Sequence, residues 1–261
     1  MLPCYTAGFG TVLARIVIAI FGGIAIAWGL ATIPIFWREA PIEYIARHII
    51  RGEPYKIEVL LRQIPAVEAV ESSTFCRPIA LWSAAIIRIR ITEQDISNED
   101  EKPIDAVTTR KLDNYIRGSL SCSAADPFLW LSLYWVETTQ SRSKHEYSKY
   151  LRMSYQLGTN EGWIAIKRNP VAFANYEELP PDIATKVITE FLTLIDSGFY
   201  EQAVDILSGP AWRLHDVILG KVATLSRRSR AAFARSAYDR GLDVKMPGIE
   251  LPYSKPPDIK F

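Results

Sequence analysis

The chain carries few residues whose types and spacing could form a reactive centre. Its three histidines (His48, His145 and His215) lie far apart, and none has a cysteine, aspartate or histidine at the spacing of a metal site. The sequence also lacks a glycine-rich phosphate loop, a Gly-x-Ser-x-Gly elbow and a Cys-x-x-Cys pair. We therefore predict a protein without catalytic residues, metal or cofactor, and interpret it as a non-enzyme.

Glu161 is the one carboxylate for which the sequence offers a catalytic alternative. It follows Asn160 at the start of a predicted helix, where a negative charge complements the helix dipole. A capping role is the simpler interpretation, and the general acid of a glycan-cleaving enzyme is the alternative. The acidic segment 92–103 lacks the ligand spacing and central glycine of a calcium loop, so we predict a solvated linker there.

Aromatic side chains are numerous, with seven tryptophans and twelve tyrosines. Such side chains fill helix–helix contacts, so core packing is the simpler interpretation, whereas a groove that stacks on sugar rings is the alternative. The residues that would form this binding site are Trp130, Tyr134, Arg152, Tyr155 and Trp163.

Two cysteines bear on the cellular location. Cys76 opens one predicted helix and Cys122 closes another, at turns that antiparallel neighbours could bring together. A disulfide between them would close a loop of about 46 residues and stabilise the fold by roughly 3–4 kcal/mol. It would also require an oxidising compartment such as the periplasm. The alternative, two buried free thiols, stays open.

An uncharged run of 22 residues, from Ile16 to Trp37, predicts a membrane anchor. As a helix it would be about 33 Å long, enough for a bilayer core of about 30 Å. Trp37 falls at its end, where an interfacial aromatic belongs. The segment 25–27 (Ala-Ile-Ala) has the look of a signal-peptide cleavage site, but the apolar run continues past it, so we predict an uncleaved single-pass anchor.

The orientation of this anchor is open on charge alone. Arg15 precedes the run, whereas Arg38, Arg47 and Arg51 follow it, so a count of positive charges places the body in the cytoplasm. Large domains, however, translocate largely regardless of flanking charge.

The remaining chain predicts helices throughout. Asp126 suits an N-cap, Pro127 a first helical position and Gly158 the residue past a helix end, which predicts antiparallel helices at about 127–139 and 143–157. Asn160 follows Asp126 by 34 positions, the length of a tetratricopeptide hairpin. The phrase Gly-x-Tyr-x-x-Ala at 198–203 is typical of the same repeat. We predict an all-α fold of stacked, degenerate hairpins behind one transmembrane helix.

Other predicted helices lie at 38–62, with a turn near Pro54, and at 78–91, 105–120, 160–168, 171–178, 183–197, 212–225 and 226–240. Pro170 separates two of them, and Gly198 and Gly241 end two others. The predicted domains are a membrane anchor (1–37), a juxtamembrane helical segment (38–75), a helical-hairpin domain (76–241) and a proline-rich extended tail (242–261).

The overall composition limits the partners. The formal net charge is +1, so no attraction to nucleic acid is expected, and hydrophobic residues at 49% are ample for a core. The basic cluster Arg227-Arg228-Ser229-Arg230 is interpreted as a solvated helix face.

Three phrases carry a resemblance to a known group of proteins: Asp126-Pro127-Phe128-Leu129-Trp130, Leu151-Arg152-Met153-Ser154-Tyr155 and Asn160-Glu161-Gly162-Trp163-Ile164. They resemble a poorly characterised group of membrane-anchored alphaproteobacterial proteins associated with extracellular polysaccharide assembly. The similarity runs from about Cys76 to Ile249, and it departs at Thr159, where the group often has proline. The resemblance implies a role near polysaccharide synthesis or export, on the periplasmic side, and supplies no catalytic residues.

Together these patterns predict a single-pass inner-membrane protein with a tetratricopeptide-like, periplasmic body. Such stacked helices form concave surfaces that hold partner proteins or a glycan chain. One alternative is a glycan-acting enzyme that uses Glu161 as its acid. Another is an accessory single-pass subunit of a different membrane complex.

Overall fold

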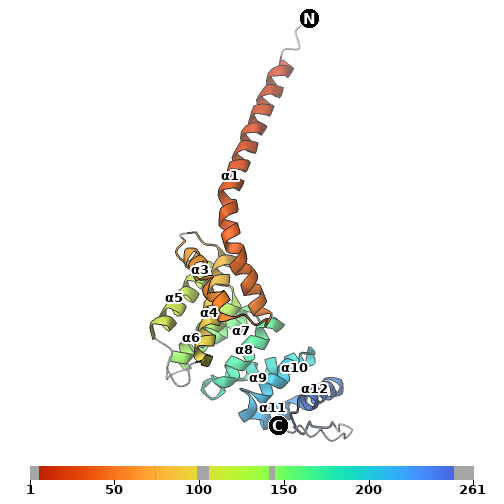
Figure 1. The fold of residues 1–261 in the computed structure, drawn as a ribbon. Helices are drawn as coiled ribbons and strands as arrows, with labels where there is room; N and C mark the ends of the chain where they lie inside the picture. The colour runs from red at the N-terminus through yellow and green to blue at the C-terminus, as the bar shows by residue number, and fades with distance from the viewer. Residues whose placement is uncertain (1–5, 74, 99–105, 141–144, 250–261) are drawn as a thin grey trace. The chain divides into compact units, whose positions relative to one another are not determined.

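The computed structural model describes residues 6–73, 75–98, 106–140 and 145–249, and every regular element in these ranges is helical (Figure 1). The predicted all-α fold is therefore confirmed for the described part of the chain. The chain divides into two compact units, residues 1–103 (unit 1) and 104–261 (unit 2). The helix that begins at Pro78 thus belongs to unit 1, whereas the predicted domain 76–241 placed it with the later helices.

Unit 1 begins with one long helix, α1, which spans Thr6–Ile50 without a break. The predicted anchor and the start of the predicted juxtamembrane segment are therefore a single element. Pro34 and Pro41 lie inside α1, although each lacks the backbone N–H that a helix uses. From Val12 to Trp37 the large apolar side chains of α1 are exposed, and α1 is long and apolar enough to cross a membrane.

The second part of α1 forms the core of unit 1. Ile42, Ile45 and Ala46 are buried, and α1 packs there against α3 (Ile64–Glu71) and α4 (Pro78–Asn98). The short helix α2 (Ile57–Leu61) adds Leu60 to the same core. These apolar side chains of α1 and α2 therefore face protein.

Helix α4 continues to Asn98, so the linker predicted to begin at Thr92 is wrong for its first seven residues. This extension makes tertiary contacts: Thr92 is buried, and the amide of Gln94 donates a hydrogen bond to the carbonyl of Tyr55, 3.1 Å away. The rest of the predicted linker lies outside the described residues.

Unit 2 is a run of helices, most of which pack against their neighbours in the sequence, α5 with α6, α6 with α7 and α8 with α9, whereas α10 packs against α12. Its α-helices are α5 (Ala106–Cys122), α6 (Pro127–Gln140), α7 (Ser148–Leu157), α8 (Gly162–Ala174), α9 (Pro181–Asp196), α10 (Tyr200–Ser208), α11 (His215–Val222) and α12 (Arg227–Asp239). Three short 3-10 helices, η1 (His145–Tyr147), η2 (Tyr176–Glu178) and η3 (Trp212–Leu214), lie between them.

Several of the helix boundaries follow the predicted signals. An Asp126 carboxylate oxygen accepts hydrogen bonds from the backbone N–H groups of Phe128 and Leu129, so Asp126 caps α6 as predicted. Gly198 and Gly241 have φ angles of 88° and 75°, values that favour glycine at helix ends.

Pro170 does not end its helix, because α8 runs through it. Buried side chains lie on both sides of the proline, Ile164 and Ala165 before it, Ala172 and Phe173 after it. Their burial in the core of unit 2 outweighs the lost hydrogen bond. The predicted separate helices 160–168 and 171–178 are therefore one helix followed by η2.

A row of phenylalanines joins the later helices of unit 2. Phe191 of α9 meets Phe173 of α8 and Phe233 of α12 edge to face, with ring centroids 5.9 and 6.2 Å apart. The chain then returns along this core as a non-helical segment, in which Met246 is buried. The rest of the predicted extended tail, 250–261, lies outside the described residues.

Candidate functional site

The start of α6 and the start of α8 lie close together at one end of the central helical hairpin. The contact is made by Gly158, where a Cβ atom would lie 2.8 Å from the Cβ of Pro127. Only glycine fits this approach, so the turn after α7 rests against the first residue of α6. This packing brings Asp126 and Glu161 near each other, although 35 positions separate them in the sequence.

We call the residues around this contact the hairpin-base cluster: Asp126, Phe128, Glu161 and Trp163. Trp163 is 38% exposed, and its Nε1–H donates a hydrogen bond to Glu161 Oε2 at 3.0 Å. The ring of Phe128 lies 5.9 Å from that of Trp163. The cluster thus presents an indole face whose orientation is fixed by a carboxylate and a second aromatic ring.

The two carboxylates of this cluster have different surroundings. Burial raises the pKa of Asp126, two backbone hydrogen bonds lower it, and the charge of Glu161 raises it further. Glu161 is exposed and stands at the N-cap position of α8, but its side chain makes no capping hydrogen bond. It holds Trp163 instead, so its predicted capping role is limited to the favourable field of the helix dipole.

A second aromatic group lies on α6 and α7. The rings of Trp130 and Tyr150 stack at 5.9 Å, and that of Tyr147 stacks on Tyr150 at 6.3 Å. The guanidinium of Arg117 lies over the Tyr150 ring at 5.6 Å. Trp130 is half-buried, and its Nε1–H donates to the carbonyl of Ala124. These rings stack on one another, which fits a packing role.

The five residues predicted to bind a ligand differ in how much of each side chain is exposed. Tyr134 and Tyr155 are 0% and 5% exposed, so neither offers a ring face to a sugar, and this part of the prediction is wrong. Arg152 is half-exposed and forms an ion pair with Asp182 of α9. Trp130 and Trp163 keep some exposed surface and stay candidates.

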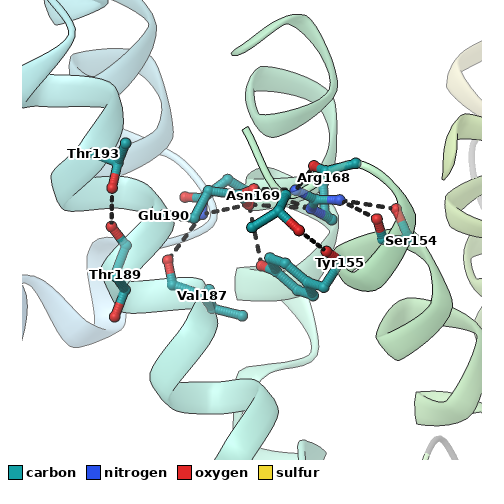
Figure 2. Close-up of polar contacts among 10 residues, drawn as sticks. Ser154, Tyr155, Arg168, Asn169, Val187, Thr189, Glu190 and Thr193 are labelled. Carbon is teal, nitrogen blue, oxygen red and sulfur yellow. Dashed lines mark hydrogen bonds and ion pairs between the residues drawn. The ribbon is translucent and has the colours of Figure 1, made fainter. Parts of the chain in front are cut away.

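A buried polar network lies at the centre of unit 2, and it was not predicted from the sequence (Figure 2). Arg168 of α8 is fully buried and forms an ion pair with Glu190 of α9. Its Nη1 donates to the carbonyl and the hydroxyl of Ser154, at 2.7 and 3.1 Å. Its Nη2 donates to the carbonyl of Gly158 at 3.0 Å. The guanidinium therefore satisfies carbonyls at the C-terminal end of α7 and ties three helices together.

Two neighbours complete this network. The Tyr155 hydroxyl donates to Glu190 Oε2 at 3.1 Å, and the Arg168 guanidinium lies 4.0 Å from the centre of the Tyr155 ring. Burial, followed by the charge of Glu190, raises the pKa of Tyr155 well above its usual value. The amide of Asn169 donates to the carbonyl of Val187 and to Glu190. Because its charges pair internally, the network is interpreted as a structural device.

A sequence signal for this network exists. Arg168 stands four residues after Ile164 and four before Ala172, so helical periodicity places it on the apolar face of α8. A buried arginine requires a carboxylate partner, and Glu190 has a similar place on the apolar face of α9, between Val187 and Leu194.

The cysteines and histidines complete the inventory of reactive groups. Cys76 and Cys122, the two cysteines predicted to pair, are both disulfide-bonded. Within the described ranges, no cluster of three or more His, Cys, Asp or Glu residues could hold a metal ion. The Nδ1 atoms of His48 and His215 contact the carbonyls of Tyr44 and Trp212 on their own helical turns.

Comparison with known proteins gives no relative from which a function could be carried over. No protein-family model, curated protein or solved structure matches the chain.

Proposed function

We propose that this protein is a membrane-tethered, non-catalytic scaffold whose helical body holds partner proteins or a glycan chain beside the bacterial inner membrane. The single observation that carries the proposal is the continuity of α1. Its exposed apolar part has the length of a bilayer crossing, and its next turns are the core of unit 1. Unit 1, which is built around the end of its own anchor, is held by a helix rather than by a flexible linker.

The body suits a binding role better than a catalytic one. Its consecutive helices pack against one another in the manner of stacked hairpins, and we propose a degenerate tetratricopeptide-like arrangement for them. The buried Arg168–Glu190 pair joins α7, α8 and α9 into one rigid block. Rigid stacked helices keep a surface in a fixed shape, which lowers the entropy lost when a partner binds.

We further propose that the body is periplasmic and supports polysaccharide synthesis or export. Two observations support this location and role. Both Cys76 and Cys122 are disulfide-bonded, and disulfides persist in oxidising compartments. The resemblance of the phrases around Asp126, Tyr155 and Trp163 to a polysaccharide-associated group is the ground for proposing polysaccharide synthesis or export.

Two experiments test this role in cells. Deletion of the gene should change the amount or chain length of exported polysaccharide, and the full-length tagged protein should co-purify with the same membrane proteins after chemical crosslinking. A matched variant, in which residues 12–37 are replaced by an unrelated transmembrane helix, should keep these partners if the body makes the contacts. If partners are lost on this exchange while the body stays folded, the alternative of an accessory subunit bound through its span gains the support instead.

The hairpin-base cluster favours a second candidate, a glycan-binding or glycan-cleaving surface. An exposed indole beside two carboxylates is suited to stacking on a sugar ring and to hydrogen bonding with its hydroxyls. Under this candidate Trp163→Ala should abolish binding to the polysaccharide, and Glu161→Gln should abolish any turnover. Leu157→Ala changes a nearby exposed apolar side chain outside the cluster and serves as the matched control.

A further inference from the structure

Among the described residues of unit 1 beyond Trp37, four large apolar or aromatic side chains are exposed, and two of them, Phe75 and Ile79, lie close together in the sequence; the other two are Tyr44 and Leu61. Phe75 is 76% exposed and Ile79 is 61% exposed. Phe75 precedes α4 and Ile79 lies in its first turn, so both belong to one short segment, residues 75–79. Single exposed apolar residues are common on protein surfaces, so their position decides whether they have a role.

An ion pair fixes this position. Arg77, which lies between the two apolar residues, pairs with Glu39 of α1. Glu39 is buried and comes two residues after Trp37, the last residue of the apolar run. The pair therefore holds residues 75–79 beside the turn of α1 at which its apolar surface ends.

Helix α4 runs away from the Arg77–Glu39 pair, toward the part of unit 1 that lies beyond the end of α1. From Ile79 to Gln94 the helix advances about 22 Å at roughly 1.5 Å per residue. Gln94 there contacts the carbonyl of Tyr55, which lies beyond the C-terminal end of α1. Both helices thus run in the same direction from the level of the Arg77–Glu39 pair. Phe75 and Ile79 lie at the end of unit 1 that is nearest to the apolar part of α1.

Two further features suit this end to a membrane surface. Arg38 is exposed directly after the apolar run, where a cation meets lipid phosphates. Cys76 is disulfide-bonded and stands between Phe75 and Arg77, so the segment is restrained by a covalent bond and an ion pair. A restrained segment loses little entropy when it enters the interface.

We propose that Phe75 and Ile79 insert into the interfacial layer of the same bilayer that α1 crosses. This inference rests on the proposed membrane anchor and adds a second point of attachment to it. The apolar surface of α1 and these two side chains form one continuous lipid contact. With two points of attachment, the tilt of unit 1 relative to the bilayer is restricted, so the same end of unit 1 always faces the membrane.

Photocrosslinking of the full-length protein in phosphatidylethanolamine–phosphatidylglycerol nanodiscs tests the proposal. The photoreactive residue p-benzoyl-phenylalanine is placed at one position at a time, at Phe75, Ile79, Phe21 or Lys56. Phe21 is an exposed phenylalanine in the middle of the apolar run and reports the anchor itself. Lys56 is exposed beside Tyr55, at the far end of unit 1, and is the matched negative control. Mass spectrometry measures the lipid adduct at each position.

The proposal expects lipid adducts at Phe75 and Ile79 within about threefold of the yield at Phe21, and at least tenfold above the yield at Lys56. Adducts at Phe21 with yields at Phe75 and Ile79 equal to that at Lys56 would overturn the inference and leave the anchor intact. Absence of lipid adducts at all four positions would instead refute the anchor. Crosslinks from Phe75 to another protein chain in place of lipid would also overturn the proposal, because they identify a different occupant.

Discussion

Removal of Glu190 is the perturbation that most directly tests how unit 2 is held together. Arg168 is fully buried, and Glu190 is its partner in the ion pair. In the variant Glu190→Ala the guanidinium stays buried without a counter-charge, and Tyr155 loses the acceptor of its hydroxyl. Breaking a buried pair from one side costs about 3–5 kcal/mol, a large part of the stability of a domain of this size.

The loss should appear as a shift of thermal unfolding. For a unit of about 150 residues, each kcal/mol lowers Tm by roughly 2–4 °C, so Glu190→Ala should lower Tm by about 6–20 °C. The assay is tryptophan fluorescence during heating of the full-length protein in detergent micelles. The matched control is Asp239→Ala, which removes the partner of Arg235 from an exposed pair four residues apart on α12. Its cost should stay below about 0.5 kcal/mol.

A double variant separates the buried charge from the lost contacts. Arg168→Met combined with Glu190→Met removes both charges, and Ser154, Tyr155 and Gly158 lose a hydrogen-bond partner. Replacing a buried ion pair by apolar side chains of similar volume costs less than leaving one buried charge without its partner. The double variant should therefore unfold at a higher temperature than Glu190→Ala alone. A double variant whose loss of stability equals the sum of the losses of Arg168→Met and Glu190→Met made singly would refute the reasoning. A Glu190→Ala variant as stable as Asp239→Ala would also refute it.

Three further predictions follow from local contacts. Burial raises the pKa of Tyr155, so the folded state keeps this proton longer than the unfolded state; stability should fall as pH rises above about 10, and Tyr155→Phe should flatten that fall in alkaline thermal unfolding. Gly158→Ala should destabilise by about 1–3 kcal/mol through the clash with Pro127, whereas Gly118→Ala, in open space within α5, should stabilise by about 0.5–1 kcal/mol, both read from Tm. Asp126→Ala should cost about 0.5–2 kcal/mol through the lost cap of α6, and Asp126→Asn should recover most of it in the same assay.

Local signals in the sequence predicted much of the helical architecture. Asp126 and Gly198 act where they stand in the chain, through a capping hydrogen bond and a positive φ angle, and both were correctly assigned. The uncharged run from Ile16 to Trp37 predicted a span by length and composition, and the described helix has both properties.

The errors arose where tertiary packing outweighs a local signal. Pro170 reads as a break, but buried residues on both sides keep α8 intact. Thr92 begins a polar stretch, yet α4 continues to Asn98, and Gln94 within it bonds to Tyr55, far away in the sequence. Both contacts join residues that are distant in the sequence, so local sequence patterns do not predict them.

The candidate site was predicted least well. Tyr134 and Tyr155 are buried, because an aromatic residue on a helix gives no sign of which neighbours will cover it. The contact between Gly158 and Pro127, which joins the hairpin-base cluster, depends on how two turns meet in space. The burial of Arg168 could have been predicted, since its spacing from Ile164 and Ala172 marks a buried position.

Thiol trapping in intact bacterial cells tests the central claim, a body tethered by α1 on the oxidising side of the inner membrane. Intact cells that contain the full-length Cys4→Ser variant are quenched in acid and labelled under denaturing conditions with a maleimide–polyethylene glycol reagent, with and without reductant, and a parallel sample is separated into carbonate-washed membranes and a soluble fraction. The account predicts a protein in the membrane fraction whose Cys76 and Cys122 gain two labels only after reduction. Free thiols that take up both labels without reductant would contradict the periplasmic body, and recovery of the protein in the soluble fraction would contradict the tether.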